Sequence, residues 1–552
     1  MARHKSGTRR VTKTKTKTKT KTRSLAARTV TVLALAAAAG MGAQAVAAPA
    51  GPVPGAPGLG PLGTAAVHGD IYSTDTIPGV GPGPSPAVNA SIPGGTCSSV
   101  FVGADGVPVA LCTAYVGTDP VEFTPPTVVA FDPATAQPVA RVQLAKGALL
   151  GGVYGYMDDQ DRVVVADGNH VLHAIGHVRD DAGRWQMTDD VLADLAPALE
   201  PGDHITGLAP GTDGRIWFVT VDSRVGTVRP GEPDSLRILD LPEAAGVHAG
   251  ERISNGITVR PGGASVMTSH ALYEITQDDG GAPQLAWRRD YERGGARNPG
   301  MLAHGSGSTP TYFGPHGDDF VAYLDAADRS TLFVLDRASG EVRCEMPAFA
   351  TTLDPDTAAA DGRLIDGPAQ SENSPIALES SGGGEWSIII ANTYGYEYMP
   401  MAVDGPAVPA HAPYRGGMTS VVTDGSGCHR AWTQHSRTAT LPKATTDDRL
   451  IHGLAYGDLH EVPAQSAELP GAGEAERGLG DAVSTGLAQK VGPVFYTAVD
   501  ADTGEEVIRS KVGDAPVDEP MELTGTVARS TDGGPGVYWQ ATMGRMLRIG
   551  AA

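Results

Sequence analysis

The stretch that most restricts the fold of this chain is Glu251–Tyr291, where short runs of β-forming residues alternate with turn residues. The runs are Ile257–Val259, Ser265–Thr268, Ala271–Ile275 and Gln284–Trp287. Short strands separated by Gly, Pro and Asp indicate an antiparallel meander. One meander of this size cannot bury its own faces, so it must pack against further copies of itself.

Further copies do occur along the chain, and most of them open with a polar residue, then a small residue, then a strand. The segments that would begin the innermost strands are Cys97–Val102, Gly151–Tyr154, Ile205–Leu208, Ser254–Ile257, Ser308–Thr311, Glu372–Ile376, Leu441–Ala444 and Leu523–Thr526. Their starts lie 49 to 82 residues apart. Eight units of four strands predict a single all-β domain over residues 67–552, an eight-bladed β-propeller. Seven blades is the alternative, if one unit is irregular.

The last unit ends after Ile549, one strand short of four, and Val67–Asp75 is expected to supply the missing strand. The seventh unit allows two registers. His452 could lie on the innermost strand, but that choice leaves only three strands in the blade. The register that places Leu441–Thr446 innermost gives four strands and brings Lys443 to the central channel, so we favour it.

The first 48 residues have the pattern of an export signal. Eleven Lys and Arg fall within residues 3–28, an apolar run covers Thr29–Ala39, and Ala45-Val46-Ala47 offers a cleavage site. The apolar run is short for a membrane span, so an uncleaved anchor is the lesser alternative. Residues 49–66 are rich in Pro and Gly and are expected to form a linker.

Cleavage would leave a strongly acidic protein. Of the 42 Lys and Arg, eleven lie in the signal, which leaves 31 against 63 Asp and Glu and a formal charge of −32. Such a charge repels nucleic acid and favours solubility. We therefore expect a secreted, extracellular monomer without nucleic-acid or, after cleavage, membrane partners. Its partner would be a small-molecule ligand or an extracellular protein.

Four cysteines in an exported protein suggest two disulfides. Cys97 and Cys112 lie symmetrically about the turn at Ala104-Asp105-Gly106, so they should face each other across one hairpin. Cys344 and Cys428 then remain, near the outer strands of consecutive blades, and would pair by elimination. Neither spacing suits a zinc site.

Polar residues that open the innermost strands should converge at one mouth of the channel. The set comprises Thr206, Asn255, Thr309, Glu372, Asn373, Lys443 and Thr524. Carboxylate and amide oxygens of Asn255, Glu372 and Asn373 could hold Ca²⁺, which takes six to eight oxygen ligands. The threonines would line the channel. The alternative is a channel whose polar side chains bond only to one another and to water.

Lys443 would favour an anionic group of a substrate. Because Asn255, Glu372 and Lys443 come from three blades, their functional groups are expected within roughly 10–12 Å of one another, the width of a small-ligand site. Asp203 and His204 could act as general bases.

Glu251 is a further candidate base at a loop edge, and its alternative, like that of Asp203 and His204, is to cap a turn. Long insertions at 348–371, 395–416 and 457–490 are predicted to emerge on the face where the innermost strands begin. Loops presented by a rigid scaffold commonly carry binding sites.

The run Ser254–Gly263 resembles the Asn-Gly-(apolar)-x-x-x-Pro-Asp-Gly strand of the SMP-30, gluconolactonase and strictosidine-synthase-like propellers. In that family the Asn matching Asn255 coordinates a channel metal, usually calcium, which polarises a substrate carbonyl. Glu372 is a possible carboxylate partner. The family's acidic ligand in the opening blade has no match, and Gly262 stands where the family has Asp.

The turn Asp500–Glu505 resembles those of PQQ-type propellers. The quinoprotein dehydrogenases of that group carry a vicinal disulfide and Trp-rich blade motifs, which this chain with its six Trp does not show, so no PQQ is expected.

Two functions remain open. The first is a metal-assisted, lactonase-like hydrolase acting on a small ester or lactone, in which Asn255 and Glu372 hold calcium and Asp203, His204 or Glu251 delivers water. The second is a non-catalytic secreted scaffold that binds through the three long insertions.

Overall fold

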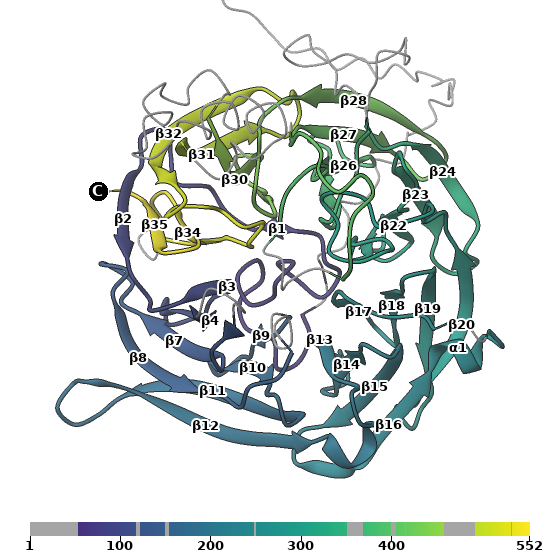
Figure 1. Cartoon of the computed structure of the whole chain (residues 1–552), viewed down its shortest axis with the longest axis horizontal. Helices are drawn as coiled ribbons and strands as arrows, with labels where there is room; N and C mark the ends of the chain where they lie inside the picture. Colours follow the sequence, from purple (N-terminus) through teal and green to yellow (C-terminus); the bar gives the residue numbers. More distant parts are fainter. Residues whose placement is uncertain are drawn as a thin grey trace, which may run out of the picture. The chain divides into compact units, whose positions relative to one another are not determined.

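The structure is a computed structural model that describes residues 53, 55–116, 122–148, 154–247, 250–349, 368–398, 404–414, 416–457, 492–530 and 533–551. These residues form eight four-stranded antiparallel blades arranged as a β-propeller (Figure 1). The predicted fold class and blade count are confirmed. The predicted signal peptide lies outside the described residues. Within the described part of the chain, no helix is long and apolar enough to cross a membrane.

The first four blades follow the predicted starts. Blade 1 contains β3 (Thr96–Val102), β4 (Pro108–Thr113), β7 (Thr127–Phe131) and β8 (Pro138–Gln143), with a small hairpin of β5 (Tyr115–Val116) and β6 (Glu122–Phe123). Blade 2 contains β9 (Tyr156–Met157), β10 (Val163–Ala166), β11 (Val171–Arg179) and β12 (Trp185–Asp194). Blade 3 contains β13 (Ile205–Pro210), β14 (Ile216–Thr220), β15 (Arg224–Arg229) and β16 (Glu232–Asp240). Blade 4 contains β17 (Ile257–Arg260), β18 (Gly263–Met267), β19 (Ala271–Gln277) and β20 (Pro283–Asp290).

The remaining blades complete the ring, together with one helix, α1 (Leu241–Ala244), and a 3₁₀ turn at Ala196–Ala198. Blade 5 contains β21 (Thr311–Phe313), β22 (Phe320–Leu324), β23 (Thr331–Asp336) and β24 (Val342–Pro347). Blade 6 contains β25 (Ile376–Glu379), β26 (Trp386–Ala391), β27 (Met418–Thr423) and β28 (Cys428–Gln434). Blade 7 contains β29 (Lys443–Thr445), β30 (Leu450–Tyr456), β31 (Gly492–Asp500) and β32 (Glu506–Ala515). Blade 8 contains β33 (Thr526–Ala528), β34 (Val537–Ala541), β35 (Met546–Gly550) and β2 (Ala87–Ser91).

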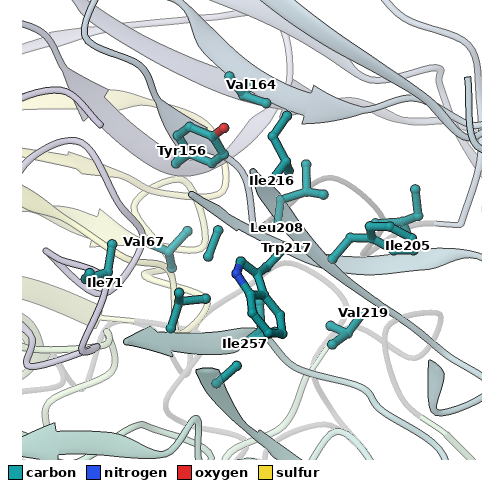
Figure 2. Packing of buried hydrophobic residues seen from close by; sticks show 14 of the residues in the cluster. Val67, Ile71, Tyr156, Val164, Ile205, Leu208, Ile216, Trp217, Val219 and Ile257 are labelled. Atoms are coloured by element: carbon teal, nitrogen blue, oxygen red, sulfur yellow. The ribbon is translucent and has the colours of Figure 1, made fainter. Parts of the chain in front are cut away.

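The second strands of the blades read as continuous apolar runs because neighbouring blades cover both of their faces. All five residues of β14 are buried, whereas β16, the outermost strand of the same blade, has no fully buried residue. Strands covered on both faces need apolar side chains at every position, while a solvated edge tolerates alternation. Figure 2 shows Leu208, Trp217 and Ile257 of blades 3 and 4 in this interior.

The predicted turn between third and fourth strands is built on an aspartate. Asp500 Oδ1 accepts hydrogen bonds from the backbone N–H of Asp502 and Thr503, at 3.0 and 2.8 Å. Such an Asx turn preorganises the hairpin. Trp432 of β28 docks on this turn from the preceding blade and donates its indole N–H to the Ala501 carbonyl at 3.0 Å.

Blades 4 and 5 are joined in the same way. The Trp287 indole of β20 donates to the Arg337 carbonyl at 2.9 Å, in the turn that follows β23. Gly340 in that turn has a φ of 71°, and a Cβ there would press on the Trp287 ring. The chain thus uses tryptophan docking at two blade junctions, although its tryptophan content is low.

The ring closes through β2, whose residues Ala87–Ser91 pair with Met546–Gly550 of β35. The expectation that the N-terminal part of the domain completes the last blade is confirmed, but the assignment of that strand to Val67–Asp75 was wrong. That earlier segment forms no outer strand. It runs through the channel and leads into β1 (Thr76–Ile77), which pairs in parallel with β29. Figure 1 shows β1 near the centre of the ring.

We name Gly63–Ile77 the plug segment, because its carbonyl groups accept hydrogen bonds from the inner strands of seven blades. The backbone donors are Val102, Met157, Val259, Tyr312, Ala377 and Ala444, and Thr526 Oγ1 supplies the bond from blade 8. Val67 and Ile71 of the plug pack into the interior of blades 2 to 4 (Figure 2). The predicted linker 49–66 therefore overlaps the packed channel, since Leu59 and Ala65 are already buried.

Both predicted disulfides are present. Cys97 and Cys112 are directly paired across β3 and β4. Cys344 of β24 and Cys428 of β28 join the outermost strands of blades 5 and 6. Such disulfides stabilise the protein mainly because they reduce the number of conformations open to the unfolded chain.

Candidate functional site

A cavity of ≈ 150 Å³ lies where the inner strands begin. Asn255, Glu372, Asn373 and Thr524, all predicted to converge there, line it together. Val67 lines it as well, so the plug segment forms part of the cavity wall. The structure thus assembles four of the predicted channel residues from blades 4, 6 and 8.

Glu372 lies in the loop before β25 and is 9 % exposed. Its Oε2 accepts a hydrogen bond from Leu302 N–H at 3.0 Å, whereas Oε1 has no hydrogen-bond partner among the described residues. Burial raises the pKa of Glu372 to about 8, against smaller lowering effects of the Leu302 N–H and the Arg297 charge. Gly307 leaves room for this carboxyl group, because a Cβ there would overlap it unless the Glu372 side chain moved.

Glu522 is a second buried carboxyl group at the cavity, and the sequence reasoning missed it. Burial raises its pKa, and the charges of Glu519 and Glu372 raise it further, while an interaction with the Asn373 side chain lowers it. Met521 and Glu522 have φ angles of 58° and 52°. A non-glycine residue in this left-handed backbone conformation costs about 1–3 kcal/mol of folding free energy. Such residues concentrate at functional sites.

Asn255 is 4 % exposed and precedes β17, as predicted. The Tyr154 hydroxyl donates to its Oδ1 at 3.2 Å. Asn373 is 2 % exposed, and neither polar atom of its amide makes a hydrogen bond of good geometry with the described residues. An amide oxygen has two lone pairs, so both asparagines retain acceptor capacity.

Tyr398 is a further cavity residue that the predicted site omitted. Its hydroxyl group has no hydrogen-bond partner within the described ranges, and burial raises its pKa. Its ring makes an edge contact with Tyr396, with centroids 4.9 Å apart. The nearby alternation Tyr394, Tyr396 and Tyr398 was the available sequence signal.

Lys443 does not join this cavity. It begins β29, as the favoured register predicts, but two residues along a strand correspond to about 7 Å, and Leu441 lies at the cavity instead. The Lys443 Nζ lies 3.5 Å from the Ala66 carbonyl of the plug segment. Burial lowers its pKa to about 8, and Asp75 and Asp70 of the plug oppose that effect. The cavity lining thus unites Asn255 and Glu372 without Lys443, and the separation of roughly 10–12 Å expected between the three functional groups stays a prediction.

Two predicted channel threonines also lie outside the cavity lining. Thr206 is 7 % exposed and donates to the Val219 carbonyl at 3.5 Å. Thr309 is 1 % exposed. Both lie beside inner strands, so the strand assignment places them in the channel wall without bringing them to this site.

The candidate general bases lie elsewhere. Asp203 accepts hydrogen bonds from the backbone of His204 and Asp222, and pairs with Arg224 at 3.6 Å. Asp203 and His204 line a separate hollow of ≈ 230 Å³. The structure therefore brings neither residue to the cavity, and Asp203 orders a turn.

Glu251 is held inside blade 4. Arg288 donates to its Oε1 at 2.6 Å, and Thr268 and Tyr273 donate to its Oε2 at 2.7 and 3.0 Å. A carboxylate with three donors, one of them an arginine, is fully partnered, so its place in the structure is explained by packing and pairing.

Among the described residues, no group of three or more His, Cys, Asp or Glu side chains is assembled as a metal-binding set. A cation in the cavity would therefore depend on two glutamates supplemented by amide oxygens. Glu372, Glu522, Asn255 and Asn373 supply oxygen atoms only, which is the donor type of Ca²⁺.

Comparison with known proteins assigns no family to the chain. No family model matches the chain. A protein of Archaeoglobus fulgidus is 37 % identical over 130 residues, which are 23 % of this chain and 25 % of that protein. The match thus spans about a quarter of that relative's length.

Solved propeller structures are similar at low identity. A europium-containing methanol dehydrogenase aligns over 88 % of this chain and 98 % of its own, with 11 % identity and a TM-score of 0.36. BamB from Moraxella catarrhalis aligns over 73 % of this chain and 98 % of its own, with 10 % identity and a TM-score of 0.35.

Proposed function

We propose that the channel-mouth cavity binds a divalent cation, Ca²⁺, and with it the carbonyl group of a small ester or lactone, which the protein hydrolyses. The observation that carries the proposal is the pair of buried carboxyl groups, Glu372 and Glu522, whose oxygen atoms are incompletely partnered. Buried polar groups without partners are rare in structures selected for stability alone, and strained backbone at Met521 and Glu522 supports a functional demand.

Glu372, Glu522, Asn255 and Asn373 would hold the cation. Glu522 comes from the closing blade and would supply the second carboxylate that the resemblance to SMP-30-like propellers lacked in the opening blade. Bound Ca²⁺ would supply Lewis-acid polarisation of a carbonyl oxygen. The signal-like N-terminus and the two disulfides support action outside the cytoplasm, where free Ca²⁺ is abundant enough for weak sites.

Calorimetric titration of the mature protein with CaCl₂ tests the cation site. Binding should be measurable at pH 8 to 9 and should weaken progressively below pH 8, because a protonated Glu372 is a poor ligand. Glu372→Gln and Glu522→Gln should each weaken binding at least tenfold. Glu345→Gln, on the exposed strand β24, is the matched control and should bind as the parent does. Absence of Ca²⁺ binding at pH 9 would refute the cation site.

Hydrolysis is tested with γ-butyrolactone and 4-nitrophenyl acetate, with Ca²⁺ present or chelated. Calcium-dependent turnover that is lost in Glu522→Gln is the expected result. The second candidate is a non-catalytic binding scaffold, and one observation favours it: none of Asp203, His204 and Glu251 lines the cavity. Ca²⁺ binding without turnover of either substrate would support the scaffold and contradict the hydrolase.

A further inference from the structure

The cavity adjoins a second hollow of ≈ 60 Å³. Tyr398 and Met521 line both volumes, whereas Met543 and Pro516 line only the second. The two hollows therefore meet across the Tyr398 and Met521 side chains. The first is lined by Glu372 and Glu522 of the proposed cation site, which do not line the second.

Exposure increases along this route. Glu372 and Glu522 are buried, Tyr398, Met521 and Met543 are half-buried, and Pro516 is exposed. Tyr398 and Met521 form the junction, and beyond it the second hollow is lined by Tyr396, Met543 and Pro516 together with Glu397 and Glu519. Its exposed Pro516 brings this end to the surface. Thioether chains have three rotatable bonds and adapt to flexible apolar ligands.

The backbone between the two hollows separates the polar end from the apolar end. Adjacent residues Met521 and Glu522 both have positive φ, and this conformation presents the thioether at the junction while the carboxyl group faces the cavity. Leu441 and Leu523 add apolar wall to the cavity around its polar end.

We propose that the ligand is an amphiphile. Its polar head, an ester, lactone or amide carbonyl, lies beside Glu372 and Glu522, and its unbranched apolar tail passes between Tyr398 and Met521 toward Met543. The polar end of this assignment rests on the proposed function, whereas the tail rests on the second hollow alone.

A series of γ-lactones with lengthening side chains tests the tail: γ-butyrolactone, γ-hexanolactone, γ-octanolactone and γ-decanolactone. Calorimetric binding is measured with Ca²⁺ present, and turnover is measured in parallel. Each methylene that leaves water should tighten Kd up to about fourfold. The gain should level off once the tail passes Met543 and reaches solvent.

Met543→Trp should fill the second hollow and reduce the ratio of the γ-butyrolactone Kd to the γ-octanolactone Kd at least fivefold. Met543→Phe serves if the tryptophan variant does not fold, as judged by circular dichroism. Val517→Trp is the matched control, because Val517 lies in the neighbouring turn with a side chain 52 % exposed and outside both hollows. It should preserve the parental ratio.

The outcomes separate this proposal from the proposed function. Turnover with a Kd that is independent of tail length overturns the amphiphile and leaves the hydrolase standing. Length-dependent binding without turnover supports the amphiphile and overturns the hydrolase. Failure of every lactone to bind overturns the amphiphile, whatever the Ca²⁺ titration shows. A parental ratio in both Met543 variants also overturns it.

Discussion

Blade 4 and the channel mouth both bury glutamates, but they treat them differently. In blade 4, Glu274 accepts from Arg260 at 2.7 Å and from Tyr312 at 2.8 Å, and Ser265 donates as well. At the channel mouth, Glu372 has one backbone donor and a free oxygen within the described part of the chain. The difference teaches that burial alone does not distinguish the two glutamates, whereas the oxygen of Glu372 without a described partner does.

The largest expected loss of stability comes from removing one partner of the buried ion pair in blade 4. Arg260→Ala would leave Glu274 buried beside no positive charge, and loss of one partner of a buried pair costs about 3–5 kcal/mol. Urea denaturation should show this loss, and Ca²⁺ titration should be unchanged. A variant as stable as the parent would contradict the view that blade 4 relies on its ion pair.

The next effect on stability is expected at the channel mouth, where one Glu372 oxygen lacks a partner among the described residues. Because the pKa of Glu372 is raised from 4.5 to about 8 in the folded protein, the folded state holds a proton that the unfolded state releases. Its contribution to stability is complete below pH 4.5 and is lost as the pH rises to 8, at about 1.4 kcal/mol per pH unit. In chelated buffer, Glu372→Gln should remove this slope from the pH dependence of the unfolding free energy. An unchanged slope would show that Glu372 is ionised in the folded protein.

The smallest effect is expected at the edge of the cavity. Tyr154→Phe removes the hydroxyl that donates to Asn255 Oδ1, a single neutral hydrogen bond worth about 0.5–1.5 kcal/mol. Thermal denaturation should show a shift of a few degrees. Ca²⁺ binding should be retained, since the asparagine oxygen becomes more available. A loss of binding would show that Tyr154 positions Asn255.

The sequence predicted the blades because they repeat, and each copy supports the interpretation of the others. It placed Asn255 and Glu372 correctly because both directly precede inner strands, where the repeat fixes position. A repeat pattern cannot predict a segment that occurs only once in the chain. The plug segment occurs once, so the sequence assigned Lys443 to the right strand but did not predict its contact with the Ala66 carbonyl.

Glu522 was missed for a related reason. The eighth unit was aligned from Leu523, and the residues before it, Pro520-Met521-Glu522, follow no rule shared with the other units. Met521 and Glu522 have positive φ angles, and the Glu522 N–H donates to the distant Ala439 carbonyl, a contact that local sequence does not encode. The Trp287 and Trp432 contacts were not predicted. Only the low number of tryptophans entered the interpretation, not their positions at equivalent blade junctions.

The plug segment has a consequence for the order of assembly. Residues 63–77 are synthesised before any blade, yet the groups that hold them extend to Thr526, more than 400 residues later. The contacts between β2 and β35 share this separation. Folding is slow when the decisive contacts join distant parts of a chain. The earliest part of the domain must therefore wait for its last partners until the ribosome has finished the final blade.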